Sequence, residues 1–428
     1  MIERIQSALE KCGITLWRIN ESVEETAELF FVRRQLDTRR VKDVHKYEVT
    51  VFRDVENPAG GQTLRGFTSV QLISSMDGAR LEEELKSAYC AARFAANPTY
   101  ELTAPVKAPL VEKTGPLAEN PLAESAGKMA KALFAPDTHD DAFVNSAELF
   151  VHRLRHRILS SEGTDVSYTD AYVKGEFVVQ CRQPEDVEIH NRYFYDELSE
   201  EALSGKVSEA LTFVRDRARA QRILKSGQYD LILSGDAVGE VLSYYQSRSS
   251  ASAVYAKYST WRTGENVQGG DTAGERLDLT LKALDPYSVE GIPMSDLPLL
   301  RAGELQAYHG PNRVCRYLGV KPTGTYEKLS CANGTVPFDE MKKTPCLWAV
   351  TFSDFQMDAM SGHFGGEIRL AYLIDGGTIT PVTGGSVNAS LLEAQKNLTF
   401  STERYTSAGY EGPYAMRLTG VSIAGEAQ

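Results

Sequence analysis

The chain has 428 residues, of which 42% are hydrophobic and 24% charged, and its formal net charge at pH 7 is -12. This much apolar material is enough for two or three domains and excludes a disordered chain. The acidic balance argues against direct binding to nucleic acid, because phosphate contacts require clustered Lys and Arg. The densest basic segment, His152–Arg157, is more simply interpreted as a solvated face.

The sequence carries no signal for a membrane or for an oxidising compartment. It has no run of 18 apolar residues and no apolar signal core near its first residues. Its six cysteines are scattered, and none forms a CxxC pair. These features predict a cytoplasmic protein with reduced thiols and no membrane association.

Residues 1–105 read as a first α+β unit. Apolar periodicity and turn residues predict helices and strands here. The predicted helices cover 3–11 and 77–97, and the predicted strands cover 25–33, 45–53 and 65–70.

Residues 106–226 read as a second unit that begins with a Pro-, Ala- and Lys-rich segment over 105–121. That composition indicates a linker or an extended strap. Helices are predicted over 122–134, 147–159 and 203–225, and strands over 164–168, 171–174 and 176–182. The order of strands and helix is similar to that of the first unit, without a repeat at the level of residues.

Residues 227–428 differ from the first two units in composition. A strand over 229–235 and a helix over 236–249 precede a long stretch rich in Gly, Thr, Ser and Tyr. Strands are predicted over 276–283, 346–352, 366–374, 378–382 and 415–423, and a helix over 387–396. The predicted fold class is therefore α+β, with two strand-strand-helix units followed by a β-rich, barrel-like C-terminal domain.

Several short blocks, each weak alone, occur in an order that resembles the TldD/PmbA family, whose members are sometimes described as modulators of DNA gyrase. The resemblance covers nearly the whole chain. The blocks are Ala88–Leu102, Ser160–Val166, Ser226–Ser234, Leu284–Pro293, Ser361–Ile368 and Arg417–Gly425.

The resemblance implies a comparison with the family's zinc helix. TldD-type members carry HExxxH on the helix after the strand, and catalytic zinc needs three protein donors and an open position for water. In this chain, the corresponding positions hold Ser243, Tyr244 and Arg248. Ser and Tyr are poor zinc ligands at neutral pH, and Arg repels a cation. The region of the family's distant Cys ligand falls near Thr383–Asn388, which contains neither Cys nor His.

The chain therefore resembles the PmbA or TldE branch, which lacks the zinc motif. The resemblance implies a non-catalytic, zinc-free subunit of a metallopeptidase complex that proteolyses unfolded peptides. This subunit would help to form the substrate chamber and would have no catalytic residues or cofactor of its own, with zinc expected only in a TldD-type partner. Peptides would be held by strand addition. The turn Ser361–Phe364, which includes Gly362 and His363, is a candidate lining of the peptide channel.

Two alternatives stay open. One is a stand-alone homodimer that binds peptides or another ligand without hydrolysis. The other is an enzyme with a displaced metal site that uses His152, His156 or His363. The i, i+4 spacing of His152 and His156 would place them on one face of the predicted helix, and the only nearby carboxylate or Cys that could complete a set of three ligands is Glu162, beyond the end of that helix. Metal analysis of the purified chain distinguishes these readings.

Overall fold

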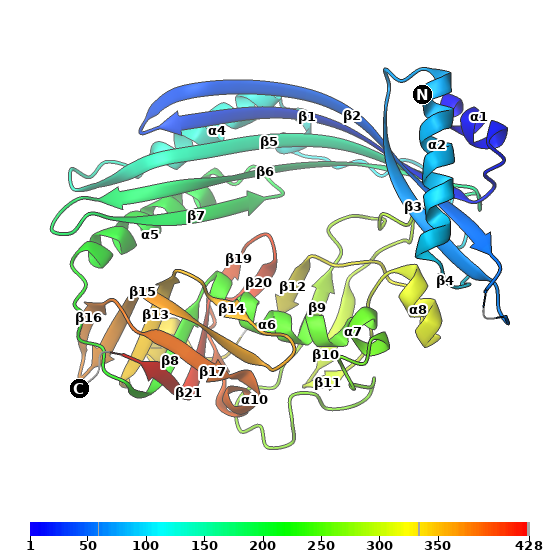
Figure 1. Ribbon diagram of the computed structural model, residues 1–428. Coiled ribbons are helices and arrows are strands. Elements are labelled where there is room, and N and C mark those ends of the chain that lie inside the picture. The colour runs from blue at the N-terminus through cyan, green and yellow to red at the C-terminus, as the bar shows by residue number, and fades with distance from the viewer. Residues whose placement is uncertain (59, 333, 426–428) are drawn as a thin grey trace.

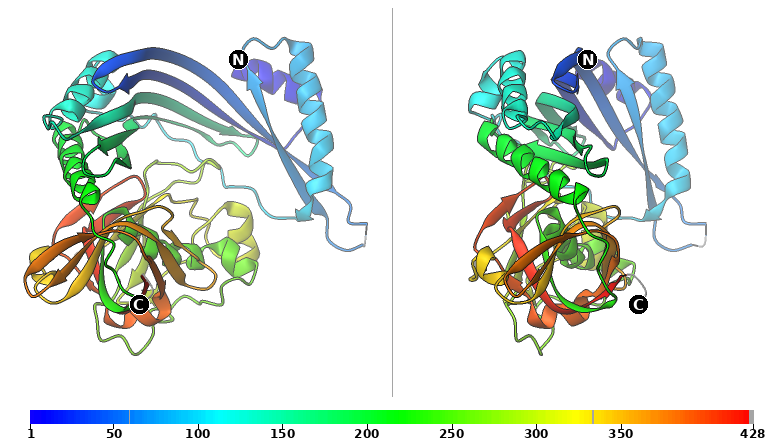
Figure 2. Two further views of the ribbon diagram at one scale, coloured as in Figure 1. Left: turned by 60° about the vertical axis from the view of Figure 1, so that its left-hand side comes forward. Right: turned by 90° about the vertical axis from the view of Figure 1, so that its left-hand side faces the viewer.

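The computed structural model describes residues 1–428 except 59, 333 and 426–428. It confirms the α+β class. A long curved sheet arches over a strand-rich C-terminal part, as Figures 1 and 2 show. No helix in the described part of the chain is long and apolar enough to cross a membrane.

The arched sheet contains seven antiparallel strands in the order β4-β3-β2-β1-β5-β6-β7. Because β1 pairs with β5 along its length, strands from both predicted N-terminal units belong to one sheet. The boundary between those units at 105/106 stays a prediction. The strands are β1 (Trp17–Val32), β2 (Gln35–Val55), β3 (Leu64–Ile73), β4 (Asn97–Pro98), β5 (Ala142–Ser160), β6 (Asp165–Cys181) and β7 (Val187–Tyr195).

Helices cover one face of this sheet. They are α1 (Ile2–Lys11), α2 (Gly78–Ala92) with η1 (Arg93–Ala95), α4 (Leu122–Phe134) and α5 (Glu200–Ala218). Leu81 and Leu85 of α2 are fully buried near β2, and Leu203 and Val207 of α5 are fully buried against β5 and β6. The opposite, concave face is turned toward the C-terminal part, since Tyr168 of β6 contacts Tyr287 with ring centroids 6.4 Å apart.

The predicted helix over 147–159 is wrong, because these residues lie in strand β5. Ala147, Leu149 and Val151 are buried in alternation, as in a strand. Strands β1 and β6 pair with β5 on both edges, so tertiary hydrogen bonds replace the helix that the local spacing suggests. The strap over 105–121 bridges β6 at Lys107 and Val111 and then forms α3 (Pro116–Glu119).

Two other predicted helices are shorter than expected. Helix α5 ends at Ala218, and Gln221 then bridges to Val382 where the chain enters the C-terminal part. The predicted helix over 387–396 is instead a strand followed by two short turns of helix. These elements are β17 (Ser386–Ser390), α10 (Leu391–Ala394) and η2 (Gln395–Asn397).

The C-terminal part contains a closed five-stranded barrel, which confirms the barrel-like prediction. Its strands follow the order β13-β8-β21-β17-β15, and β15 pairs back with β13. The bounds are β8 (Gly227–Ser234), β13 (Cys346–Phe352), β15 (His363–Asp375) and β21 (Ala415–Ala424). Strands β14 (Gln356–Met357) and β16 (Thr378–Val382) pair with β15, and β18 (Thr399–Phe400) pairs with β21.

A second, six-stranded sheet lies beside the barrel in the order β11-β10-β9-β12-β20-β19. Helix α6 (Asp236–Ser249) follows β8 and buries Val238, Val241 and Leu242 in the core that these sheets share. The remaining elements are α7 (Ala251–Tyr255), β9 (Leu279–Lys282), β10 (Leu297–Arg301), β11 (Glu304–Leu305), α8 (Asn312–Leu318), β12 (Lys328–Cys331), α9 (Phe338–Met341), β19 (Arg404–Thr406) and β20 (Tyr410–Pro413).

Glu290 joins the two parts of the molecule. Its carboxylate lies 3.8 Å from a guanidinium nitrogen of Arg18 on β1 and accepts a 2.8 Å hydrogen bond from the Asn312 amide. Its carbonyl oxygen accepts a 3.1 Å hydrogen bond from the Thr103 hydroxyl. The strap, the sheet and α8 therefore meet at one partly buried residue, which helps to hold the arch over the C-terminal part.

Candidate functional site

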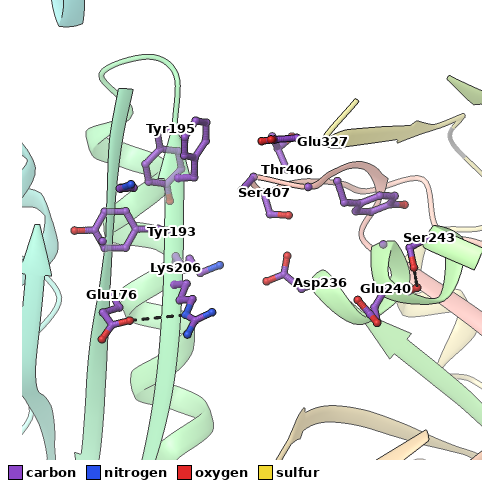
Figure 3. A pocket seen from close by; sticks show the side chains of 18 of the residues that line it. Glu176, Tyr193, Tyr195, Lys206, Asp236, Glu240, Ser243, Glu327, Thr406 and Ser407 are labelled. Atoms are coloured by element: carbon purple, nitrogen blue, oxygen red, sulfur yellow. Dashed lines mark hydrogen bonds and ion pairs between the residues drawn. The ribbon is translucent and has the colours of Figure 1, made fainter. Parts of the chain in front are cut away.

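A cavity of about 580 Å³ lies between the arched sheet and helix α6 (Figure 3). This volume is in the range of small-molecule and peptide side-chain sites, about 300–1,000 Å³. A second cavity of about 640 Å³ adjoins it, and the two share Arg192, Lys206, Asp236 and Glu240 in their walls. The N-terminal half of α6 therefore borders both cavities.

Helix α6 presents one stripe of residues to the first cavity. Asp236, Gly239, Glu240, Ser243 and Gln246 line it, and their spacing of three or four residues places them on one helix face. The turn into this helix depends on glycine, because Gly235 has a φ of +63°.

Hydrogen bonds hold the polar side chains of this stripe. The Ser243 hydroxyl donates to the Glu240 carbonyl oxygen at 2.6 Å, and the Glu240 carboxylate accepts from the Met357 amide at 3.0 Å. The Gln246 side-chain amide donates to the Tyr326 carbonyl oxygen at 2.8 Å. The helix wall is thus an ordered polar surface.

The opposite wall comes from β5, β6, β7 and α5. Glu176 of β6 lies 3.1 Å from His190 and 3.8 Å from Arg192, both on β7. Lys206 of α5 donates a 3.1 Å hydrogen bond to the Tyr405 hydroxyl, which links this wall to the C-terminal part. Burial raises the pKa of Tyr195 to about 12, so its hydroxyl stays protonated at neutral pH.

Stacked rings cross the concave face of the sheet and end at the cavity. The rings of His152 and Tyr172 have centroids 4.6 Å apart, and those of Tyr172 and Phe194 are 5.2 Å apart. Phe194 lines the cavity. The sequence-based reading missed this row because it placed His152 on a helix, where no cross-strand partners exist. Period-two alternation over 147–151 is the signal that could have found it.

The structure contradicts a metal site built on His152 and His156. On a strand, residues four apart are separated by about 13 Å, at about 3.3 Å per residue, so they cannot share an ion bound at about 2 Å. The His152 Nδ1–H instead donates a 2.7 Å hydrogen bond to the Glu24 carboxylate, and His156 stacks on Tyr168 at 4.7 Å. Burial lowers the pKa of both imidazoles.

The three degenerate zinc positions do not converge. Ser243 lines the cavity, whereas Tyr244 is 4% exposed and packs edge-on against Trp261 with centroids 5.6 Å apart. The Arg248 guanidinium lies 5.7 Å from the Trp261 ring and donates to the Tyr258 carbonyl oxygen. These residues do not fit a zinc ion. Among the residues that the structure describes, no group of three or more His, Cys, Asp or Glu is arranged to hold a metal.

The segment Ser361–Phe364 leads into β15, and none of its residues lines either cavity, although the Phe364 ring lies 6.1 Å from that of Phe355 in the wall of the second. Phe364 is 2% exposed and belongs to the core. His363 is exposed, and Gly362, with a φ of +76°, packs close to Tyr244. A channel-lining role for this turn stays a prediction, and the buried ring of Phe364 is the residue least suited to it.

The comparisons with known proteins agree with this architecture. Residues 226–425 match the family model described as the PmbA/TldA metallopeptidase C-terminal domain. This match covers the barrel, the second sheet and α6. The resemblance of the chain to the TldD/PmbA family is thereby confirmed. No curated protein sequence matches the chain significantly.

Solved structures share the fold along the whole chain. TldE from Thermococcus kodakarensis is 16% identical with a TM-score of 0.78, over 99% of this chain and 100% of that one. A proposed modulator of a DNA gyrase from Thermotoga maritima is 15% identical with a TM-score of 0.78, over 99% of both chains. One from Bacteroides thetaiotaomicron is 17% identical with a TM-score of 0.76, again over 99% of both.

Proposed function

We propose that the chain is the non-catalytic, zinc-free subunit of a TldD/TldE-type metallopeptidase complex that proteolyses unfolded peptides. It forms part of the substrate chamber and associates with a TldD-type subunit, which holds the zinc. The complex works in the cytoplasm, without direct contact of this chain with nucleic acid or membrane.

One observation carries the proposal. Helix α6 follows β8 and faces a cavity, yet Ser243 is the one member of the three motif positions in the cavity wall. Tyr244 and Arg248 are engaged by Trp261 instead. The strand and helix that would present a zinc motif are present, but the side chains at the motif positions take part in packing and hydrogen bonding.

The second cavity suits an extended peptide. Strand β7 forms an edge of the arched sheet, and residues 188–192 of this strand line that cavity. An edge strand has one row of backbone groups available, and a peptide can pair with them whatever its side chains are. This agrees with a chamber that accepts unfolded segments of varied sequence.

The first test is the metal content and activity of the full chain alone. We expect far less than one zinc per chain by mass spectrometry and no hydrolysis of unfolded peptides. Mixing with a TldD-type subunit that carries HExxxH should give a stable complex, with hydrolysis that a chelator abolishes. Stoichiometric zinc in the chain alone would contradict the proposal. A zinc-free chain that forms a homodimer and does not bind TldD-type subunits would favour the alternative that it binds peptides as a stand-alone protein.

A matched pair of variants tests whether the cavity belongs to the chamber. Ser243→Trp fills the cavity beside α6 and should reduce hydrolysis by the complex, while the zinc content of the complex stays the same. Ser252→Trp adds the same ring at an exposed position on α7, outside the lining of either cavity, and should leave hydrolysis unchanged. Equal activity of the two variant complexes would count against a chamber at this place.

A further inference from the structure

The first cavity has two unlike walls (Figure 3). The wall from the C-terminal part carries three carboxylates, those of Asp236, Glu240 and Glu327, and no Lys or Arg side chain. Hydroxyl groups of Thr406 and Ser407 lie between them. This wall is therefore anionic and rich in hydrogen-bond acceptors.

None of these three carboxylates forms an ion pair with another described residue of the chain. Glu240 accepts from the Met357 amide, and burial together with the nearby charge of Asp236 raises the pKa of the Tyr405 hydroxyl. Glu327 is exposed to the cavity and is one of the carboxylates whose charge opposes ionisation of nearby Asp285. The carboxylates of this wall therefore have no ion-pair partner among the described residues, and they would attract a cation that enters the cavity.

The facing wall supplies aromatic rings and three cationic side chains, those of Lys174, Arg192 and Lys206. The Lys174 ammonium lies 5.5 Å from the Tyr172 ring. Phe150, Phe194 and Tyr195 line this side. The Lys206 ammonium is hydrogen-bonded to the Tyr405 hydroxyl at 3.1 Å, and Arg192 lies 3.8 Å from Glu176. A cation between aromatic faces and carboxylates gains from both, through cation–π attraction and charge-assisted hydrogen bonds.

We propose that this cavity is a specificity site that binds the cationic side chain of a Lys or Arg residue in an extended peptide. The carboxylates of Asp236 and Glu327 bind the charged end, and the rings of the sheet wall cover its aliphatic stem. This inference rests on the proposed function in that the ligand is a peptide. It adds a preference for one kind of side chain to a chamber that otherwise binds the peptide through backbone hydrogen bonds.

Binding of matched peptides to the full chain tests the preference. Three fluorescein-labelled peptides of one sequence carry Lys, Met or Glu at a single central position, and fluorescence anisotropy gives their Kd values at low and physiological salt. One charge-assisted hydrogen bond is worth about tenfold in affinity, so we expect Lys to bind about tenfold more tightly than Met, and Glu to bind most weakly.

Two variants locate the effect. Asp236→Asn with Glu327→Gln should bring the ratio of the Lys and Met Kd values close to one. Glu327→Gln alone, at an exposed position, should lower the ratio about threefold without affecting folding. The control Glu10→Gln with Asp43→Asn removes the same net charge far from the cavity and should keep the wild-type ratio.

Equal Kd values of the Lys and Met peptides for the wild-type chain would overturn the inference, as would an unchanged ratio in the double variant. Both results leave the peptide role itself intact. Failure of all three peptides to bind, alone and in the complex with a TldD-type subunit, would contradict the proposed function as well.

Discussion

Reinstating the zinc motif should not reinstate a zinc site. The triple substitution Ser243→His, Tyr244→Glu and Arg248→His writes HExxxH onto α6 at the positions that correspond to the motif. The structure places the three side chains in different surroundings, with position 243 at the cavity, 244 in the core and 248 beside Trp261. We expect the variant to bind no zinc and to be less stable than the wild type.

The loss of stability comes mainly from position 244. The Tyr244 ring makes edge-to-face contacts with Tyr245 at 5.5 Å and Trp261 at 5.6 Å, each worth about 1 kcal/mol. Removing its buried surface costs about 2 kcal/mol more. The new carboxyl has no partner there and adds at least about 1 kcal/mol. Loss of the Arg248 contact with Trp261 adds about 0.5 kcal/mol. The total is about 5 to 6 kcal/mol, or a fall in Tm of about 10 °C.

Thermal unfolding and mass-spectrometric zinc analysis check this result. Ser243→His alone is the matched control, because it faces the cavity and should change the Tm by less than about 2 °C. A triple variant that keeps the wild-type Tm and binds one zinc per chain would refute the reasoning. It would show that the ligands alone, and not the packing around α6, decide whether this helix holds metal.

Three further predictions follow from local contacts. In Gly239→Ala the added Cβ would lie 2.6 Å from the Cβ of Tyr410, so the clash should outweigh the gain in helix propensity and lower stability by about 1 to 2 kcal/mol; a raised Tm would contradict this. Glu290→Gln leaves Arg18 on β1 without its carboxylate partner and should cost about 2 kcal/mol, measured as a lower Tm and faster cleavage between sheet and barrel by a protease. Burial and neighbouring carboxylates raise the pKa of Asp285 to about 6. Since the folded state resists ionisation of this group, stability is lost as the pH rises from about 4 to 6. Asp285→Asn should therefore raise the free energy of unfolding at pH 7.5 by on the order of 1 kcal/mol, measured as a higher Tm, but hardly change it near pH 4.

Local periodicity was sufficient for segments whose own residues mark where they begin and end. The helices over 122–134 and 236–249 and the strands over 346–352 and 378–382 have the predicted bounds. Such segments carry their own signals of start, period and end, so their type can be read without knowing their partners.

Strand β5 is a segment for which local periodicity predicts the wrong secondary structure. Its charged half, His152–Arg157, has the spacing of a helix face, and only pairing with β1 and β6 makes it a strand. The error also concealed the stacked rings of His152, Tyr172 and Phe194, since cross-strand neighbours are far apart in sequence. Contacts between distant strands leave little trace in local composition.

Some features of the candidate site can likewise be predicted from the sequence, whereas others depend on the tertiary structure. The residue types at 243, 244 and 248, which cannot form a zinc site in the usual way, and the blocks that resemble the TldD/PmbA family are properties of the sequence itself. Tertiary structure decided which of these positions face a cavity, and it brought Asp236, Glu240 and Glu327 into one wall. The physical reason is that the chemistry of a side chain is fixed by its residue type, so it can be read from the sequence. The cavity is lined by residues of β7, α6 and β20, which are far apart in the sequence and become neighbours only when the chain folds.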